Sequence, residues 1–346
     1  MLLFTIEDGK HVLDNSVKTK KIKEYKGVRI KYAWTIDKKG LAAMTSSFFA
    51  TIAILFSKAD VVHYHAEGPC AWLWIIKLFS NKKVIATIHG LDWQRAKWGG
   101  FATKYIKHGE KVAAKYADEI IVLSKNVQDY FEEEYGRKTY FIPNGVSKPD
   151  IKKASYIEKK YNLKKDSYIL YLGRIVPEKG IHYLIDAYNQ IKTDKKLIVA
   201  GGASDTSEYY KELLEKTKEN ENIVWTGFVQ GEELQELYSN AYIYVLPSDL
   251  EGMPLSLLEA MSYGNCCLTS DIPECATVIE DKGVTFNKSN VEDLRKKLND
   301  LLKDNNKVKQ YKDNAQDYII NKYNWDNVVE ETIKLYQRKR VNDEEV

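Results

Sequence analysis

Residues 242–259 have the sequence YIYVLPSDLEGMPLSLLE, in which a strand, a loop and the start of a helix follow one another. The apolar run ends at the Pro-Ser pair, a loop with Gly252 follows, and Pro254 stands where helices favour proline as the first residue. Glu251 is therefore predicted in a loop at the carboxyl end of a strand, and Glu259 about a turn and a half inside the helix. A continuous apolar strand next to a helix is typical of a parallel sheet covered on both faces.

The same alternation of apolar runs and helical stretches fills both halves of the chain. The strands predicted in the first half are Leu2 to Ile6, Val28 to Tyr32, 60–65, 83–88, 119–124 and 139–142. Those predicted in the second half are 168–172, 196–200, 223–226, 242–246 and 266–269. With 346 residues the chain suits two domains rather than one. The fold class we predict is α/β, with two doubly wound Rossmann-like domains that face a cleft, where ligands bind outside the carboxyl ends of the strands.

A polar, lysine-rich stretch over 147–165 marks the boundary between these domains. We predict an N-terminal domain of residues 1–147 and a C-terminal domain of residues 148–324. A last helix, over 325–340, has apolar residues at helical spacing and is expected to pack back on the N-terminal domain. The apolar stretch Leu41 to Phe56 is shorter than the roughly 20 residues of a membrane span and is interrupted by Ser and Thr, so a buried helix is predicted there.

A second segment, YILYLGRIVPEKG at 168–180, places Gly173, Arg174 and Lys179 in one loop after a strand. Two cations on one loop suit a diphosphate, whose negative charge grows as it leaves. Taken alone, the two would be solvated loop charges. Their place beside the Glu251 to Glu259 segment favours a role in binding.

Other polar groups stand at predicted strand ends. The turn Gly227-Phe228-Val229 follows one strand, and His89 follows another at the start of HGLDWQRAKWGG, residues 89–100. Together with HYHAEG at 63–68, that run supplies candidates for an acceptor pocket: His63, His65, Glu67, Asp92 and Arg95. A His-x-His pair also suits a metal, but no third ligand stands nearby, so no metal site is predicted.

These motifs resemble those of the family-four retaining glycosyltransferases of the GT-B fold. The two glutamates separated by seven residues within Glu-Gly-x-Pro match the signature of that family, in which the first glutamate contacts the donor sugar and the second binds the ribose. The resemblance therefore assigns these roles to Glu251 and Glu259. It assigns Arg174 and Lys179 to the departing diphosphate and places His89 near the reacting sugar. The resemblance and the glycine turns mark out further donor contacts: Gly173, Gly227, Phe228, Val229, Gly252, Met253 and Pro254.

The donor that this resemblance implies is a nucleoside-diphosphate sugar. The acceptor that it implies is a saccharide, either free or carried on a polyprenyl diphosphate. The hydroxyl of the acceptor would attack on the face that the diphosphate leaves, with that diphosphate as the base. No Asp-x-Asp pair occurs, which fits a transfer without metal or other cofactor. The run 89–100 is similar to a subgroup of bacterial capsule and cell-wall enzymes that includes rhamnosyltransferases.

Members of the family begin with a strand, a glycine-rich loop and a first helix, and the chain shows no Gly-Gly loop in residues 1–36. A shortened reading frame, a misplaced start and a natural truncation each explain this. A non-catalytic protein that binds a sugar nucleotide is therefore the second hypothesis. A sugar-nucleotide epimerase is the third, and the Glu-Gly-x-Pro segment argues against it.

Charge and cysteine usage bear on the partners and the compartment. Residues 1–145 carry 23 Lys and Arg against 15 Asp and Glu, which gives that half a net charge of +8. A basic half suits an anionic membrane surface or a phosphate-bearing acceptor, and a solvated face without a partner explains the charge equally well. Nucleic acid is not expected, because no binding motif accompanies the charge. Four cysteines without metal-ligand spacing indicate free thiols and a reducing compartment, hence the cytoplasm, where the inner face of the membrane would be accessible.

Overall fold

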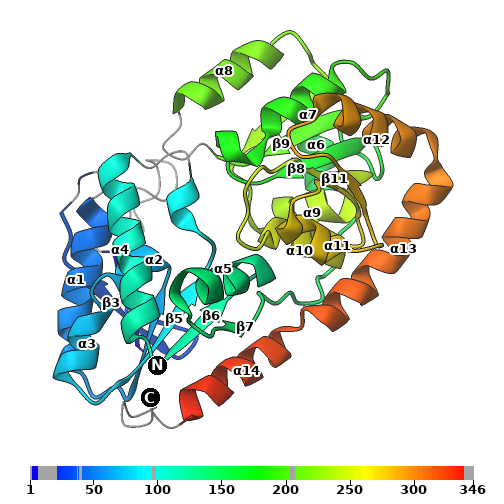
Figure 1. The fold of residues 1–346 in the computed structure, drawn as a ribbon. Helices are drawn as coiled ribbons and strands as arrows, with labels where there is room; N and C mark the ends of the chain where they lie inside the picture. The colour runs from blue at the N-terminus through cyan, green and yellow to red at the C-terminus, as the bar shows by residue number, and fades with distance from the viewer. Residues whose placement is uncertain are drawn as a thin grey trace. The chain divides into compact units, whose positions relative to one another are not determined.

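The computed structural model describes residues 2–6, 22–36, 38, 41–95, 99–202 and 207–338. The chain forms two compact units, one of Met1–Ile142 with Glu330–Val346 and the other of Pro143–Val329. Both are α/β, and the strands of each main sheet are parallel, as predicted (Figure 1). We call the first the N-terminal unit and the second the C-terminal unit. The sequence placed the boundary at 147 and the last helix at 325–340; α14 spans Trp325–Gln337.

The C-terminal unit is built on a six-stranded sheet in the order β10-β9-β8-β11-β12-β13. Its strands are β8 (Tyr168–Leu172), β9 (Lys196–Ala200), β10 (Ile223–Gly227), β11 (Ile243–Leu246), β12 (Cys266–Ser270) and β13 (Val284–Phe286). This is the 3-2-1-4-5-6 order of the Rossmann fold, with the switch point between β8 and β11. Five of these strands had been predicted; β13 has only three residues and no distinct apolar run.

Eight helices accompany that sheet in the described part of the C-terminal unit. They are α6 (Tyr156–Tyr161), α7 (Ile181–Tyr188), α8 (Ser207–Thr217), α9 (Gly231–Asn240), α10 (Leu255–Ser262), α11 (Pro273–Ile279), α12 (Val291–Lys303) and α13 (Asn305–Lys322). Helix α12 packs on α7, and α13 packs on α10 (Figure 1). The central strands β8 and β11 are buried along almost their whole length, as expected for a sheet covered on both faces.

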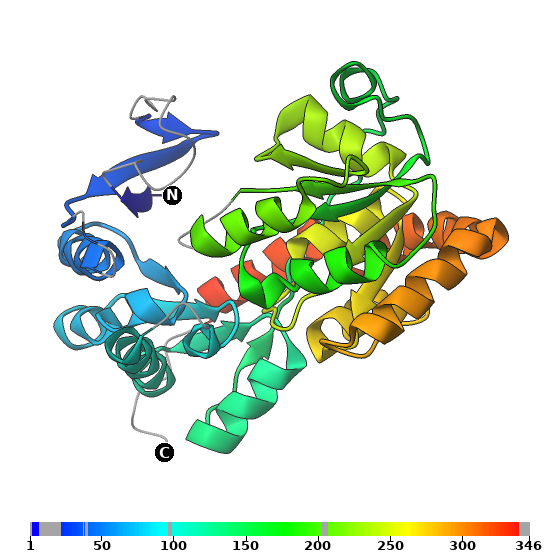
Figure 2. The same ribbon diagram turned by 90° about the horizontal axis from the view of Figure 1, so that it is seen from above.

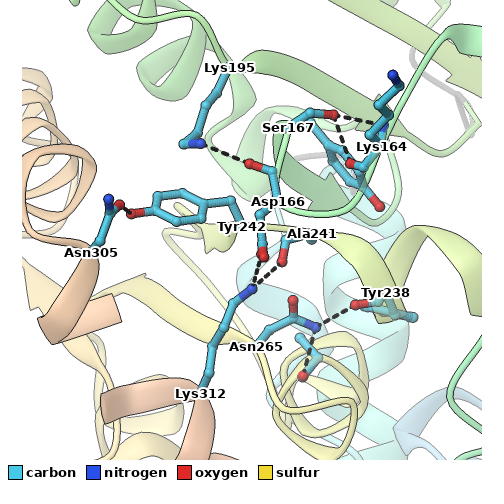
Figure 3. A network of polar contacts seen from close by, with 12 residues as sticks. Lys164, Asp166, Ser167, Lys195, Tyr238, Ala241, Tyr242, Asn265, Asn305 and Lys312 are labelled. Atoms are coloured by element: carbon cyan, nitrogen blue, oxygen red, sulfur yellow. Dashed lines mark hydrogen bonds and ion pairs between the residues drawn. The ribbon is translucent and has the colours of Figure 1, made fainter. Parts of the chain in front are cut away.

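A polar network holds α13 at the amino-terminal edge of this sheet (Figure 3). The ammonium of Lys312 pairs with Asp166, just before β8, and donates to the Ala241 carbonyl, just before β11, at 2.7 Å. Lys195 donates to the Asp166 carbonyl at 2.8 Å and lies over the Tyr242 ring. These contacts lie at the edge opposite the carboxyl ends of the strands, so their role is structural.

The N-terminal unit contains a four-stranded sheet in the order β4-β5-β6-β7. Its strands are β4 (Val61–His65), β5 (Lys83–Ile88), β6 (Glu119–Val122) and β7 (Tyr140–Phe141). The helices between them are α2 (Glu67–Cys70), α3 (Leu73–Phe79), α4 (Gly100–Tyr116) and α5 (Lys125–Tyr135). These four strands are the last four of the six predicted for this half of the chain.

A second, three-stranded sheet joins β1 (Leu2–Ile6), β3 (Val28–Ala33) and β2 (Glu24–Tyr25) in the order β1-β3-β2. Strands β1 and β3 are parallel, and helix α1 (Leu41–Leu55) packs against them and against α3 (Figure 2). The region where a glycine-rich loop was sought includes residues 7–21, which lie outside the described residues.

The prediction of a buried helix over Leu41 to Phe56 is correct about the helix and wrong about its burial. Its polar residues Ser46 and Thr51 are the buried ones, and the Thr51 hydroxyl meets that of Tyr64 at 2.9 Å. Phe49 and Phe56 are exposed instead. Among the described residues, no helix has both the length and the apolar character needed to span a membrane.

Candidate functional site

The two loops that carry the predicted donor-binding residues follow neighbouring strands at the switch point. Strand β8 ends at Leu172 and leads to the Arg174 loop, whereas β11 ends at Leu246 and leads to the Glu251 loop. Because parallel strands share one carboxyl edge, the two loops meet there, as the pairing of β8 with β11 requires. The sequence prediction that these segments lie together is thus explained by the strand order.

Backbone contacts lock the two loops together. The amide of Asp249 donates to the Glu178 carbonyl at 2.9 Å. Gly180 has a left-handed φ of 65°, and a Cβ at this position would lie 2.0 Å from the Pro247 carbonyl oxygen. Only glycine therefore fits here, because a side chain would meet both an unfavourable dihedral and a fixed backbone atom.

Lys179 and Glu251 form an ion pair between these loops. The Lys179 ammonium lies 2.5 Å from Glu251 Oε1, and the side chains are only 15% and 6% exposed. The buried Ser248 hydroxyl donates to the same oxygen at 2.7 Å. Both contacts use Oε1, which leaves the other carboxylate oxygen without such a contact among the described residues. Ser248 was not predicted, although it stands three residues before Glu251.

Arg174 differs from Lys179 in its surroundings. Its backbone carbonyl accepts a hydrogen bond from the Tyr171 hydroxyl at 2.9 Å, which fixes the loop. Within the described parts of the chain, its guanidinium makes no side-chain hydrogen bond or ion pair. A half-buried guanidinium without a protein partner is suited to a planar anion such as a phosphate.

Glu259 lies inside α10, eight positions after Glu251. The Tyr238 hydroxyl donates to its Oε2 at 3.1 Å. Burial raises the pKa of the Glu259 carboxyl, and the hydrogen bond from Tyr238 opposes that rise. The structure begins α10 at Leu255, so Pro254 precedes the helix rather than opening it, a shift of one residue that is ordinary at helix ends.

The remaining predicted donor residues lie around the same edge of the sheet. The Gly173 amide donates to the Ala200 carbonyl, and the Gly201 amide to the Gly227 carbonyl, at 3.0 and 2.8 Å. Phe228 is 56% exposed beside the buried Val229. Met253 receives the Asn144 amide on its sulfur at 3.0 Å, and Gly252 precedes it in the loop. These residues lie in or next to the Arg174 and Glu251 loops and at the neighbouring strand ends.

In the N-terminal unit, side chains at the end of β4 form hydrogen bonds with side chains at and just after the end of β5. His63 Nε2 lies 2.7 Å from the Thr87 hydroxyl, and His65 Nδ1 lies 3.1 Å from His89 Nε2. Two residues further on, the Asp92 amide donates to Glu67 Oε1 at 3.0 Å. The two histidine contacts follow from the two-residue period of β4, which turns His63 and His65 to the same side of the sheet. Glu67 opens α2, and its contact with Asp92 lies beyond the ends of the strands.

The three histidine rings form a stack. The ring centroids of His63 and His65 are 4.3 Å apart, and those of His65 and His89 are 5.3 Å apart. Burial and the neighbouring rings lower the pKa of His63 to about 3 and that of His65 to about 4. Burial also lowers the pKa of His89. All three are therefore neutral at physiological pH. In the described residues, no group of three ligating side chains is arranged to hold a metal ion.

His63 has both ring nitrogens engaged, because Nδ1 meets the Tyr336 hydroxyl of α14 at 2.7 Å. Neither nitrogen is left to contact an acceptor, and its position indicates a structural role. Tyr336 is 273 residues away in the chain, so nothing in the local sequence could have indicated this contact.

Glu67 is completely buried, and among the charged residues that act on it Asp92 has the largest effect. Burial, together with the charge of Asp92, raises the pKa of the Glu67 carboxyl to about 8. Its Oε2 makes no hydrogen bond to the described residues. Arg95 pairs with Asp92 at 2.8 Å. Residues 96–98 of the predicted acceptor run lie outside the described residues.

A further buried carboxylate, Glu110, was missed from sequence. It accepts hydrogen bonds from Trp93 at 2.9 Å, Tyr130 at 2.8 Å and Tyr135 at 2.5 Å. Lys107 lies 3.8 Å from the same carboxylate and 3.9 Å from the centroid of the Trp93 ring. The cluster fixes the segment that carries Asp92. A Glu on the buried stripe of an amphipathic helix was the only local signal.

Comparison with known proteins identifies the family of this chain. The family model described as Glycosyltransferase Family 4 matches residues 8–148, and that described as Glycosyl transferases group 1 matches residues 153–318. These two matches, one in each half, cover nearly all of the chain. The chain belongs to the family-four glycosyltransferases of the GT-B fold.

Individual relatives are distant. An uncharacterized glycosyltransferase of Methanocaldococcus jannaschii is 26% identical over 297 residues, which is 81% of this chain and 75% of that protein. The O-antigen chain mannosyltransferase B of Escherichia coli is 28% identical over 184 residues, which is 51% of this chain and 48% of that protein.

Solved structures share the fold. The sucrose-phosphate synthase of Thermosynechococcus elongatus has a TM-score of 0.80 at 20% identity, with 91% of this chain and 84% of that chain covered. The Anabaena protein HepE, solved in complex with UDP and glucose, has a TM-score of 0.75 at 18% identity, with 89% and 85% covered.

Proposed function

We propose that this glycosyltransferase takes its sugar from a nucleoside-diphosphate donor held by the C-terminal unit. The observation that carries the proposal is the pairing of two loops at the switch point, where Arg174 keeps an unpaired guanidinium within the described residues and Lys179 meets Glu251. Arg174 and Lys179 bind the diphosphate, and Glu251 orients the donor sugar. Glu259 accepts hydrogen bonds from the ribose. The solved complexes of HepE with UDP and with UDP-glucose support this choice of donor.

The proposed chemistry is transfer with retention at the anomeric carbon. The acceptor oxygen bonds to that carbon as its bond to the diphosphate oxygen breaks, on the same face. The proton of the acceptor hydroxyl passes to the diphosphate. Cations aimed at the leaving oxygens stabilise the charge that develops there, so neither metal nor another cofactor is required. The first amides of α10, which have no partner inside the helix, bind phosphate or sugar oxygens.

The acceptor is proposed to be a saccharide bound by the N-terminal unit. His89, His65, Asp92 and Arg95 supply neutral and charged hydrogen-bonding groups after β4 and β5. The relatives from Escherichia coli and Salmonella typhimurium, which are an O-antigen and a lipopolysaccharide transferase, support a place in bacterial surface-polysaccharide synthesis. A deoxyhexose such as rhamnose is the sugar that the subgroup resemblance favours, and a polyprenyl diphosphate is the proposed carrier.

A lipid-linked acceptor would bring the enzyme to the inner face of the membrane in the cytoplasm. Trp34 and Phe56 are 53% and 82% exposed in the N-terminal unit, and Trp34 packs edge-on against Phe49. Arg29 on β3 and Lys26 in the turn between β2 and β3 add positive charge. Exposed aromatics with basic neighbours suit an anionic bilayer surface. Sedimentation with vesicles that contain phosphatidylglycerol, compared with vesicles of phosphatidylcholine alone, tests this contact. Binding to neither kind of vesicle, or equal binding to both, would contradict it.

A donor screen by mass spectrometry tests the function as a whole. The protein is incubated with UDP-, GDP- and dTDP-sugars, with and without saccharide acceptors, in the presence of EDTA. We expect transfer or slow hydrolysis of one donor, lowered about 10²- to 10³-fold in Arg174→Ala. Turnover should be unchanged in Arg295→Ala, a half-exposed arginine on α12 that pairs with Glu292. The anomeric coupling in the product reports retention. Nucleotide binding without any turnover would instead favour a non-catalytic binding protein.

A further inference from the structure

Tyr238 occupies a position that the proposed donor chemistry does not yet use. It lies in α9 and is 1% exposed, and its hydroxyl is 3.1 Å from Glu259 Oε2. The Ser256 carbonyl is the other acceptor within reach, at 3.3 Å. A hydroxyl has one proton to donate, and the charged carboxylate is the stronger acceptor. Tyr238 therefore occupies Oε2 and leaves Oε1 for a ligand.

Asn265 fixes the backbones on both sides of this contact. Its side-chain amide donates to the Tyr238 carbonyl at 2.9 Å and to the Ala260 carbonyl at 3.0 Å (Figure 3). Ala260 directly follows Glu259, so a single buried amide ties α9 to α10 beside the pair. The Tyr238 ring also stacks on Tyr263, with centroids 5.2 Å apart. The hydroxyl is thus held by packing and by backbone contacts, not by Glu259 alone.

We propose that Tyr238 is a positioning residue for nucleotide binding, which orients the Glu259 carboxylate and keeps it ionised so that Oε1 accepts from the vicinal ribose hydroxyls. The proposal rests on the proposed role of Glu259 in ribose binding. Tyr238 acts through Glu259 and does not itself touch the nucleotide.

The electrostatics of the site are consistent with this role. Burial raises the pKa of Glu259, and the Tyr238 hydroxyl lowers it. Among the described residues Tyr263 also interacts with Glu259, and burial raises the pKa of Tyr263, so that it stays neutral. No cation among the described residues pairs with this carboxylate. Within that part of the chain, the Tyr238 hydroxyl is therefore the main group that offsets the cost of burying the charge.

The first test measures nucleotide affinity across pH. UDP, GDP and dTDP are titrated into the wild-type chain by calorimetry from pH 5 to pH 8, and the nucleotide that binds is used further. We expect Tyr238→Phe to weaken binding about tenfold at pH 7, as for loss of one hydrogen bond to a charged group. The acid limb of the binding curve should also move to higher pH, because the carboxylate becomes easier to protonate.

Matched variants separate this role from a loss of folding. Tyr188→Phe removes another buried hydroxyl, which donates to the Lys195 carbonyl at 2.7 Å, and should leave affinity and its pH dependence unchanged. Glu259→Gln should weaken binding and abolish the acid limb. In the Glu259→Gln background, Tyr238→Phe should have no further effect on the pH dependence.

The outcomes distinguish the inference from the function on which it rests. If the wild-type chain binds none of the three nucleotides, both are overturned. If it binds one, and Tyr238→Phe matches Tyr188→Phe in affinity and in pH dependence, the positioning role alone is wrong. A weaker affinity with no movement of the acid limb would also overturn it, because a general loss of packing explains that result.

Discussion

Replacing Lys179 by methionine separates the structural and catalytic contributions of the ion pair at the switch point. The ammonium is 2.5 Å from Glu251 Oε1, and both side chains are largely buried. Methionine keeps most of the aliphatic stem and removes the charge. Glu251 then keeps only the Ser248 hydroxyl as a partner on that oxygen.

The cost in stability follows from the geometry. At an effective dielectric of about 20, two charges at this distance attract by roughly 6–7 kcal/mol, most of which is offset by the loss of hydration. Breaking a fully buried pair costs roughly 3–5 kcal/mol, because one charge stays buried and unpaired. Lys179 keeps 15% exposure, so we expect about 2–3 kcal/mol for Lys179→Met. Glu251→Gln in the same chain should recover most of that loss, because neither charge remains.

The assay combines urea unfolding, followed by circular dichroism, with donor turnover. We expect Lys179→Met to be destabilised and inactive, and Lys179→Met/Glu251→Gln to be near wild-type stability and still inactive. Turnover that returned with stability in the double variant would refute the assignment of both residues to the donor. A Lys179→Met chain as stable as the wild type would refute the ion pair itself.

Three further changes test other parts of the reasoning. Arg174→Ala should lower turnover by about 10²- to 10³-fold and change stability by less than about 0.5 kcal/mol, since the guanidinium has no partner among the described residues; clear destabilisation in urea would contradict this. Glu67→Gln should remove a pH dependence, because the folded-state pKa of about 8 lies above the ordinary value of 4.5. The contribution of this carboxyl to the free energy of unfolding is therefore complete below pH 4.5 and falls by roughly 2–3 kcal/mol between pH 6 and pH 9. Urea unfolding at the two pH values checks it, and an equal fall in the variant would argue against it. Gly180→Ala should lower the free energy of unfolding by more than about 2 kcal/mol. Its control is Gly231→Ala, which should cost about 1 kcal/mol, because Gly231 has a similar left-handed φ of 59° but no atom within 4 Å of the added Cβ. Equal melting temperatures for the two variants would contradict this prediction.

Arg174 and Lys179 differ in how much the stability of the fold depends on them. Arg174 has no ion-pair partner among the described residues, so we expect the fold to tolerate its loss. Lys179 is the partner of a carboxylate that is 6% exposed, so we expect its loss to destabilise the fold. The distinction depends on burial and pairing, which neither the residue type nor its spacing reveals.

The sequence by itself determined the α/β class, most of the strands and the family. Apolar runs bounded by glycine and proline report strand and helix periodicity locally, and Glu251 and Glu259 are close enough in the chain for their spacing to be read directly. It also placed His89 at a strand end, and Arg174 and Lys179 in the loop after a strand, because each of these segments begins with an apolar run.

Only the tertiary structure decided which groups act on one another. The strand order that sets β8 beside β11 depends on the path of the whole chain, and so does the pairing of Lys179 with Glu251 across 72 positions. Tyr238 reaches Glu259 from a different helix, and His63 meets Tyr336 from the other end of the chain. Hydrogen bonds and burial depend on distances in space, and residues far apart in sequence leave no local pattern that records them.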